Sequence, residues 1–211
     1  REVVELLEQH RLKVRILPGL SDIVSGRNLV SLVREVDVGD LLGRDPIAAD
    51  PELLHKCITG KVVLVTGAGG SIGSELSHQI AALSPRQLIL LDHSEPALYQ
   101  VHRKVEGLNV CPVVPCLGSV VDIGVVQHVF KTYGVQTVYH AAAHKHVPLV
   151  ESNISEGVRN NILGTQNVAK AAAEFGAETF VLISTDKAVR PTNVMGSTKR
   201  LAEMLLQALS A

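Results

Sequence analysis

From residue 61 onward, short apolar runs alternate with amphipathic stretches, and this alternation constrains the fold more than any other feature of the sequence. The apolar runs, rich in β-branched residues, are KVVLVTG (61–67), QLILLD (87–92), VCPVVPCLG (110–118), VQTVYHAAA (135–143) and ETFVLIST (178–185). Stretches of helical period lie near residues 71–83, 95–107, 122–133, 155–175 and 195–210. Nearly continuous apolar strands joined by helices are typical of a parallel sheet covered on both faces. The sequence therefore predicts an α/β fold with a doubly wound, Rossmann-like parallel sheet.

The residues before this pattern have a different character. REVVELLEQH (1–10) predicts a helix and KVRILP (13–18) a short strand, as in the tail of a preceding α/β domain. Residues 20–58 mix Pro, acidic and polar positions and predict a connecting segment that packs on its neighbours. We therefore divide the chain into residues 1–58 and a Rossmann-like domain over 59–211. The chain lacks an initial Met and ends in a helical pattern without a Gly or Pro stop signal, so we expect it to be part of a longer protein, truncated at its C-terminus.

Composition excludes some classes of partner. Lys and Arg number 20 against 21 Asp and Glu, so there is no basic excess that would favour a nucleic acid as partner. The three cysteines, Cys57, Cys111 and Cys116, lack CxxC spacing, which favours a reducing, cytoplasmic compartment over a disulfide framework. No apolar run of membrane-spanning length and no secretion leader occurs in these residues, so we expect this piece itself neither to cross a membrane nor to be secreted.

A glycine pattern follows the first predicted strand. VLVTGAGGSIGSEL (63–76) places Gly67, Gly70 and Gly73 at GxxGxxG spacing, with Ser71 and Ile72 between them. Glycines at this turn let the chain bend tightly and let a pyrophosphate approach the N-terminus of the next helix. The pattern predicts a dinucleotide site, with a glycine-rich turn that binds nothing as the alternative.

An acidic residue strengthens the dinucleotide interpretation. Asp92 ends the second predicted strand, 19 positions after Gly73, where a carboxylate accepts hydrogen bonds from the adenosine ribose hydroxyls. Its negative charge opposes a 2′-phosphate, so the sequence favours NAD over NADP. The alternative is that Asp92 caps the following helix. Asp122 begins the next predicted helix and is interpreted as an N-cap.

Five longer segments carry a family resemblance. In chain order they are TGAGGSIGSEL, LLDHSEPALY, HAAAHKHVPLVE, NNILGT and STDKAVRPTNVMGSTKR. Over about residues 60–205 the chain resembles the nucleotide-sugar dehydratases of the extended short-chain dehydrogenase/reductase superfamily. It is most similar to their membrane-associated, polysaccharide-biosynthesis type, which acts as UDP-N-acetylglucosamine 4,6-dehydratase.

This resemblance implies a lyase with tightly bound NAD and a UDP-sugar substrate. Larger members of the family carry N-terminal transmembrane helices and a first Rossmann-like domain, followed after this region by a sugar-binding part. We therefore expect the full-length protein to lie on the cytoplasmic face of the inner membrane, to be a homo-oligomer, and to need its sugar-binding part for turnover.

The segment STDKA ends the fifth predicted strand, the edge where open α/β sheets bind ligands. By resemblance, Asp186 protonates the leaving C6 hydroxyl and Lys187 removes the C5 proton. Physically, Lys187 must be partly neutral and Asp186 protonated for these roles. The alternative is an ordinary surface ion pair between Asp186 and Arg190.

Met195 stands where most members of the superfamily carry a catalytic Tyr, four residues before Lys199. The membrane-associated dehydratases carry the same Met, so the resemblance implies an active subgroup. By resemblance Lys199 bonds the nicotinamide ribose, and we hypothesise that Thr185 positions a water or relay that replaces the Tyr. The alternatives are a core Met in an inactive helix and a solvated helix lysine.

HAAAHKHVP (140–148) contributes a floor of small residues, Ala141, Ala142 and Ala143, on which the cofactor can lie. By resemblance Lys145 reaches cofactor and substrate, with a solvated loop lysine as the alternative. By resemblance Asn160 also supports the substrate site and Ser119 contacts the cofactor, although Asn160 and its neighbour Asn161 equally fit helix capping. His140, His144 and His146 lie close in sequence, but no Cys, Asp or Glu in this segment completes a ligand set, so no metal is expected.

The leading hypothesis is an NAD-dependent nucleotide-sugar 4,6-dehydratase. One alternative is an NAD-dependent nucleotide-sugar epimerase or reductase, which predicts Tyr at position 195 and no Asp-Lys pair after the fifth strand. The other is a dinucleotide-binding domain without catalysis, which leaves STDKA unexplained.

Overall fold

The computed structural model describes residues 15–16, 34–35 and 49–209, and contacts divide the chain into two units, Arg1–Ala49 and Asp50–Ala211. In the first unit, strand β1 (Arg15–Ile16) pairs antiparallel with β2 (Arg34–Glu35). The helix predicted over 1–10 lies outside the described residues, as does most of the strand predicted over 13–18.

The second unit is built on a five-stranded parallel sheet. Its strands are β3 (Val62–Thr66), β4 (Gln87–Asp92), β5 (Val113–Leu117), β6 (Thr137–His140) and β7 (Thr179–Leu182). Their order is β5-β4-β3-β6-β7, and every neighbouring pair is parallel. The chain starts at β3, moves outward to β5, and returns past β3 to β6, so the strand order reverses between β3 and β6. The predicted doubly wound, Rossmann-like sheet is confirmed.

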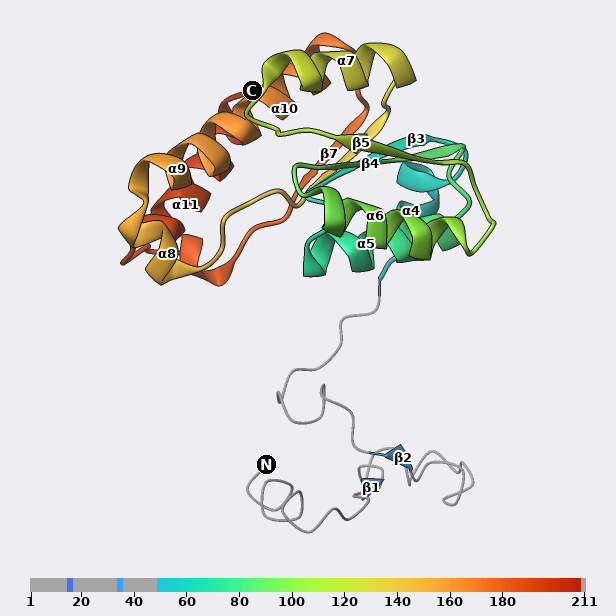
Figure 1. Cartoon of the computed structure of the whole chain (residues 1–211), viewed down its shortest axis with the longest axis horizontal. Coiled ribbons are helices and arrows are strands. Elements are labelled where there is room, and N and C mark those ends of the chain that lie inside the picture. The colour runs from blue at the N-terminus through green and yellow to red at the C-terminus, as the bar shows by residue number, and fades with distance from the viewer. Residues whose placement is uncertain (1–14, 17–33, 36–48, 210–211) are drawn as a thin grey trace. The chain divides into compact units, whose positions relative to one another are not determined.

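Helices cover both faces of the sheet. They are α4 (Pro51–Ile58), α5 (Ser71–Ala82), α6 (Glu95–Glu106), α7 (Ile123–Tyr133), α8 (Val147–Ser152), α9 (Ile154–Val158), the π-helix η2 (Arg159–Leu163), α10 (Gly164–Glu174), the 3₁₀-helix η3 (Asp186–Ala188) and α11 (Val194–Leu209). Figure 1 shows α5 and α6 on one side of the sheet and α7 and α10 on the other. The helix predicted over 155–175 is divided into α9, η2 and α10. Among the described helices, none is both long and apolar enough to cross a lipid bilayer.

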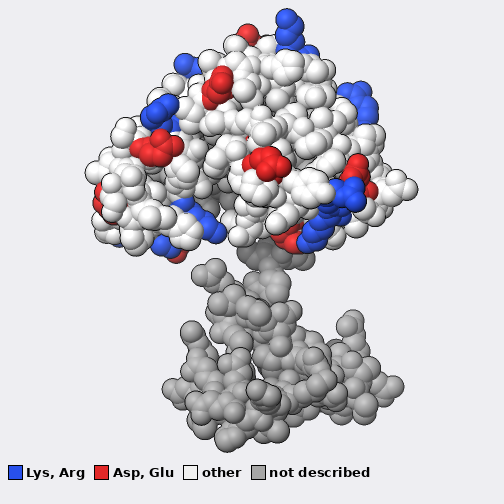
Figure 2. Space-filling view, in the orientation of Figure 1, with Lys and Arg blue, Asp and Glu red and all other residues white. Residues whose placement is uncertain are grey.

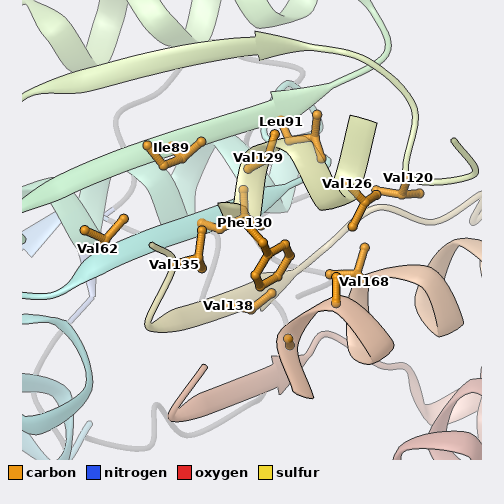
Figure 3. Packing of buried hydrophobic residues seen from close by; sticks show 13 residues of the cluster. Val62, Ile89, Leu91, Val120, Val126, Val129, Phe130, Val135, Val138 and Val168 are labelled. Atoms are coloured by element: carbon orange, nitrogen blue, oxygen red, sulfur yellow. The ribbon is translucent and has the colours of Figure 1, made fainter. Parts of the chain in front are cut away.

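Alternating side chains of the strands supply two separate apolar layers. Val62 and Leu64 of β3 pack with Ile89 and with residues of α7 and α10, whereas Val63 and Val65 pack with residues of α4, α5 and α6. In Figure 3 the Phe130 ring of α7 lies among the valines of the first layer. The residues of both layers are buried, which explains the continuous apolar runs of β3 and β4.

Helix α4 belongs to the second unit. Asp50 caps it, Ile58 is buried in the second apolar layer, and the Thr137 hydroxyl of β6 donates to the Cys57 carbonyl at 2.6 Å. The compact unit therefore begins at Asp50, nine residues before the boundary predicted at residue 59. The end of the predicted connecting segment is a helix that packs under the sheet's N-terminal edge.

Local signals set the start and end of α7 as expected. The Asp122 carboxylate accepts hydrogen bonds from the N–H groups of Gly124 and Val125 at 2.9 and 3.3 Å, which confirms the predicted N-cap. The helix ends at Gly134, which has the positive φ of a left-handed C-terminal residue. On the face seen in Figure 2, acidic and basic side chains of the second unit are interspersed.

The first apolar layer should dominate the stability of the second unit. Phe130 is 1% exposed and stacks near Phe175, so we expect Phe130→Ala to lower the free energy of unfolding by about 3–5 kcal/mol in urea denaturation. The matched control is Tyr99→Ala, because Tyr99 is 61% exposed, and it should cost less than about 1 kcal/mol. Equal costs for the two variants would contradict this packing.

Candidate functional site

Two adjoining cavities open at the carboxyl edge of the sheet, where the strand order reverses. The larger measures about 770 Å³ and the smaller about 240 Å³. Their shared lining includes Gly67, Gly70, Ala141, Ala143 and His144. Every residue predicted to bind the cofactor lines one or both cavities, as do Lys145 and Asn160, which were predicted to bind the substrate. In an open α/β sheet, a crevice at this switch point is the usual ligand site.

The glycine loop between β3 and α5 forms the boundary between the cavities. Gly67 has φ +65°, and a Cβ there would lie 2.6 Å from the Ala142 backbone nitrogen. At Gly73 a Cβ would lie 2.0 Å from the Gly67 carbonyl oxygen, so a side chain would push the helix off the loop. Among the described residues, no side chain caps the N-terminus of α5, and Ser71 and Ile72 of its first turn line the larger cavity. The free N–H groups and the helix dipole suit this end to an anion such as a pyrophosphate.

The smaller cavity holds the predicted ribose carboxylate. Asp92 lines it together with Ser119, Ala142 and Asn160. The buried Asp92 side chain accepts hydrogen bonds from the N–H groups of Gly69 at 2.9 Å and Ser94 at 2.8 Å. Because Ser94 is the residue that precedes α6, Asp92 does not occupy the N-cap position, and the alternative interpretation as that cap is wrong. Asp92 fastens the glycine loop to β4 and faces the cavity.

Of the predicted acid-base pair, only Lys187 lines a cavity among the described residues. Thr185 and Lys187 line the larger cavity, as does Lys145 from the loop after β6. Asp186 lies outside the lining of both cavities in the described part of the chain, and its side chain is 84% exposed. Its carboxylate accepts a hydrogen bond from the Thr185 hydroxyl at 3.0 Å and lies 3.7 Å from the Lys187 ammonium. The side chain of Lys187 therefore lines the cavity, whereas the Asp186 carboxylate lies outside its lining in this conformation.

Helix α11 contributes Met195 and Lys199 to the larger cavity, from one face and one turn apart. Lys199 is 5% exposed and donates a hydrogen bond to the Ile183 carbonyl at 2.6 Å, so it is not a solvated helix lysine. Burial lowers the pKa of the Lys199 ammonium to about 8, while the Glu203 carboxylate acts in the opposite direction. A buried amine that titrates near neutrality is suited to a binding or proton-transfer role.

Two contacts fix the start of α11 and were not predicted from the sequence. A Cβ at Gly196 would lie 2.3 Å from the Lys187 carbonyl oxygen, so the helix touches the backbone of η3 directly. The Glu151 carboxylate of α8 accepts a hydrogen bond from the Val194 N–H at 2.7 Å. The position of Met195 relative to Lys187 is therefore set by backbone contact.

Asn161 is a positioning residue that the sequence left open between support and helix capping. It lies inside the π-helix η2, is 1% exposed, and brackets His144 by accepting from its N–H at 2.7 Å and donating to its carbonyl at 3.0 Å. It also donates to the Thr198 hydroxyl of α11 at 3.0 Å. Its neighbour Asn160 donates to the Asn161 side chain at 3.1 Å. The available signal was the pair of adjacent asparagines within a predicted helix, because amides require hydrogen-bond partners where they are buried.

Of the three histidines of HAAAHKHVP, His140 and His144 contact different partners, and His146 lines the larger cavity. His140 is buried between the hydroxyls of Thr66 and Thr165, whereas His144 lies 3.5 Å from the Glu156 carboxylate. In the part of the chain that the structure describes, no group of three or more His, Cys, Asp or Glu side chains is arranged to hold a metal ion.

Sequence comparison adds the family. Residues 63–211 match the profile of a family described as polysaccharide biosynthesis protein. The chain belongs to this family. The capsular polysaccharide biosynthesis protein CapD of Staphylococcus aureus is 48% identical over 199 residues, which is 92% of this chain and 33% of that protein. The chain thus spans about a third of the length of this relative.

More distant relatives carry the names of enzymes. A UDP-N-acetylglucosamine 4,6-dehydratase (inverting) of Campylobacter jejuni is 32% identical over 153 residues, covering 70% of this chain and 43% of that enzyme. A UDP-glucose 4-epimerase of Rickettsia bellii is 33% identical over 150 residues, covering 69% and 42%.

Solved structures share the fold of the second unit. Pen from Bacillus thuringiensis superposes with a TM-score of 0.68 at 30% identity, covering 72% of this chain and 48% of that one. MoeE5, solved in complex with UDP-glucose and NAD, gives a TM-score of 0.60 at 26% identity and covers 71% and 49%.

The lowered pKa of Lys199 predicts a pH-dependent stability. The unfolded chain keeps this proton up to about pH 10.5, whereas the folded protein loses it near pH 8. Between these values the unfolded state binds more protons, so the free energy of unfolding of the wild type should rise with pH relative to Lys199→Met. We expect a relative gain on the order of 2 kcal/mol between about pH 7 and pH 10 in urea unfolding. A difference that stays constant with pH would contradict the buried ammonium.

Proposed function

We propose that this chain is the NAD-binding, catalytic part of a nucleotide-sugar 4,6-dehydratase in surface polysaccharide or glycan biosynthesis. Its substrate would be UDP-N-acetylglucosamine and its product a UDP-4-keto-6-deoxy sugar. The observation that carries the proposal is the larger cavity, which brings the N-terminus of α5 together with Lys187 and the buried Lys199. The family membership and the related dehydratase of Campylobacter jejuni support the same reaction class.

The residues of the two cavities fit NAD. Among the described residues no side chain caps α5, so its first-turn N–H groups can bind the pyrophosphate. The Asp92 carboxylate can accept hydrogen bonds from the two hydroxyls of the adenosine ribose. Small side chains at 141–143 leave room for a flat ring against the backbone. NAD, when bound, supplies reversible hydride transfer, so that C4 of the sugar is a ketone while water is lost and the hydride ends on C6. The NAD bound in MoeE5, which shares this fold, supports the choice.

The C4 ketone is what makes the elimination possible, because it acidifies the C5 hydrogen. We assign removal of the C5 proton to Lys187, which lines the larger cavity, and protonation of the leaving C6 hydroxyl to Asp186. The exposed Asp186 carboxylate must rotate toward the substrate for this role. Lys199, held by the Ile183 carbonyl, would bond the nicotinamide ribose.

Oxidation at C4 needs an acceptor for the hydroxyl proton, and the Met195 thioether cannot serve. We propose that Thr185 positions a water or relay for this proton. The Thr185 hydroxyl accepts a hydrogen bond from the backbone N–H of Lys187 at 3.3 Å and donates one to the Asp186 carboxylate at 3.0 Å. These bonds support the proposal because they link a hydroxyl at the cavity to a carboxylate.

An epimerase is the second candidate, favoured by the relative in Rickettsia bellii. Met195 and the lysine at position 187 argue for the dehydratase. For the full-length protein we further propose a homo-oligomer at the cytoplasmic face of the inner membrane, as the resemblance to the membrane-associated dehydratases implies.

The full-length protein incubated with UDP-N-acetylglucosamine should form a 4-keto-6-deoxy product, detected by a mass loss of one water. Lys187→Met should lower kcat by about 100-fold or more with an unchanged Kd for NAD, because only proton abstraction is removed. The matched control is Lys170→Met on the exposed face of α10, which should behave as wild type. Recovery of a C4 epimer would favour the epimerase, and unchanged sugar would favour a binding domain without catalysis.

Thr185→Val tests the proposed relay. It should lower the rate of C4 oxidation by about 100-fold, followed in a single turnover as reduced nicotinamide, because the variant lacks the hydroxyl that orients the proton acceptor. Thr185→Ser keeps that hydroxyl and should stay close to wild type. Normal oxidation by the Val variant would eliminate Thr185 from this step.

A further inference from the structure

A chain of buried hydrogen bonds crosses the switch point beneath the cavities. The Thr66 hydroxyl at the end of β3 lies 2.7 Å from His140 Nδ1 at the end of β6, and His140 Nε2 lies 3.0 Å from the Thr165 hydroxyl of α10. The Thr165 hydroxyl in turn lies 2.7 Å from the Asn161 carbonyl in η2. All four residues are buried.

The direction of these bonds follows from counting hydrogens. A carbonyl only accepts, so Thr165 gives its single hydroxyl hydrogen to Asn161 and must accept the hydrogen on His140 Nε2. His140 Nδ1 then carries no hydrogen and accepts from Thr66. Burial lowers the pKa of His140 to about 3, and the charge of nearby Lys199 acts in the same direction, so the ring is neutral. The imidazole is thus held in one tautomer, in which Nε2 donates to Thr165 and Nδ1 accepts from Thr66.

The last bond of the chain lies at an irregular turn. At the end of η2 the Gly164 N–H bonds to the Arg159 carbonyl five residues back, the wide spacing of a π-helix. The Thr165 hydroxyl holds the Asn161 carbonyl within this turn, and the Asn161 side chain holds both the backbone of His144 and the Thr198 hydroxyl. Any shift of the turn therefore moves the loop 144–146 and α11, which both line the larger cavity.

We propose that His140 is a positioning residue for this cavity. As a neutral donor to Thr165 it fixes the π turn, and through Asn161 it sets the loop 144–146 and α11. An apolar side chain would fill the same volume without the cost of burying two ring nitrogens, so the imidazole is explained by its hydrogen bonds. The catalytic consequence rests on the proposed function, whereas the geometric consequence does not.

The test compares Thr165→Val, which keeps the shape of the side chain and removes the hydroxyl, with Thr165→Ser, which keeps the hydroxyl. In the full-length protein, the Val variant should exchange the His144 amide hydrogen about tenfold faster and lower kcat by about tenfold, with the sugar KM within about twofold. The Ser variant should stay within about threefold of wild type in both measurements.

Thr137→Val is the control for losing any buried threonine hydrogen bond. Thr137 begins the strand that His140 ends, is equally buried, and donates to Cys57 at the opposite edge of the sheet. This variant should lower Tm without changing His144 exchange or kcat. Equal behaviour of the Thr165 Val and Ser variants, or the same loss of kcat in Thr137→Val, would overturn the proposal.

A double-variant cycle tests His140 itself. If His140 acts through Thr165, then His140→Phe combined with Thr165→Val should lose no more kcat than the larger single loss. Additive losses would overturn the proposal. If the wild type forms no dehydration product, the proposed function fails. The positioning role is then judged by hydrogen exchange alone: faster exchange of the His144 amide in Thr165→Val alone supports it, and unchanged exchange overturns it.

Discussion

The parallel pairing of β3 with both β4 and β6 is the constraint on which the site depends. From β3 the chain continues to β4 on one side, and from β6 it continues to β7 on the other side. The loops that follow β3 and β6 therefore diverge and leave a crevice at the carboxyl edge of the sheet. The loops still start in contact, since Gly67 has no room for a side chain against Ala142. The glycines therefore have two effects: they let the two loops pack closely together, and they leave the N-terminus of α5 without a side-chain cap beside the cavity.

The fold was predictable because its signals are local and repeated. The strands β3, β4 and β6 are buried on both faces, and Asp92 falls at a strand end that the topology must bring to the crevice. The remaining features depend on contacts between distant segments. Asp186 and Lys187 are neighbours in sequence, yet the 3₁₀ turn directs only Lys187 to the cavity lining. The role of Asn161 depends on His144 and on α11, which lie far from it in the chain, so no spacing rule could reveal it.

Burial, more than charge pairing, shapes the electrostatics of the site. Lys199 and His140 are both removed from water, and both are thereby shifted toward their neutral forms. Each side chain keeps hydrogen bonds to fixed partners, and these bonds offset part of the free-energy cost of burying a polar group. The Lys187 and Asp186 side chains, by contrast, are 52% and 84% exposed and lie 3.7 Å apart as a solvated ion pair.

The absence of a side chain at Gly196 has a mechanical implication. Because Gly196 has no side chain, the main chain of the first turn of α11 packs directly against the Lys187 carbonyl of η3. This close main-chain contact prevents α11 and η3 from sliding past one another. Any closing motion would have to carry both as a single rigid body. The spacing between the main-chain segments that carry Lys187 and Lys199 would then stay constant during such a motion, although the two side chains differ in exposure.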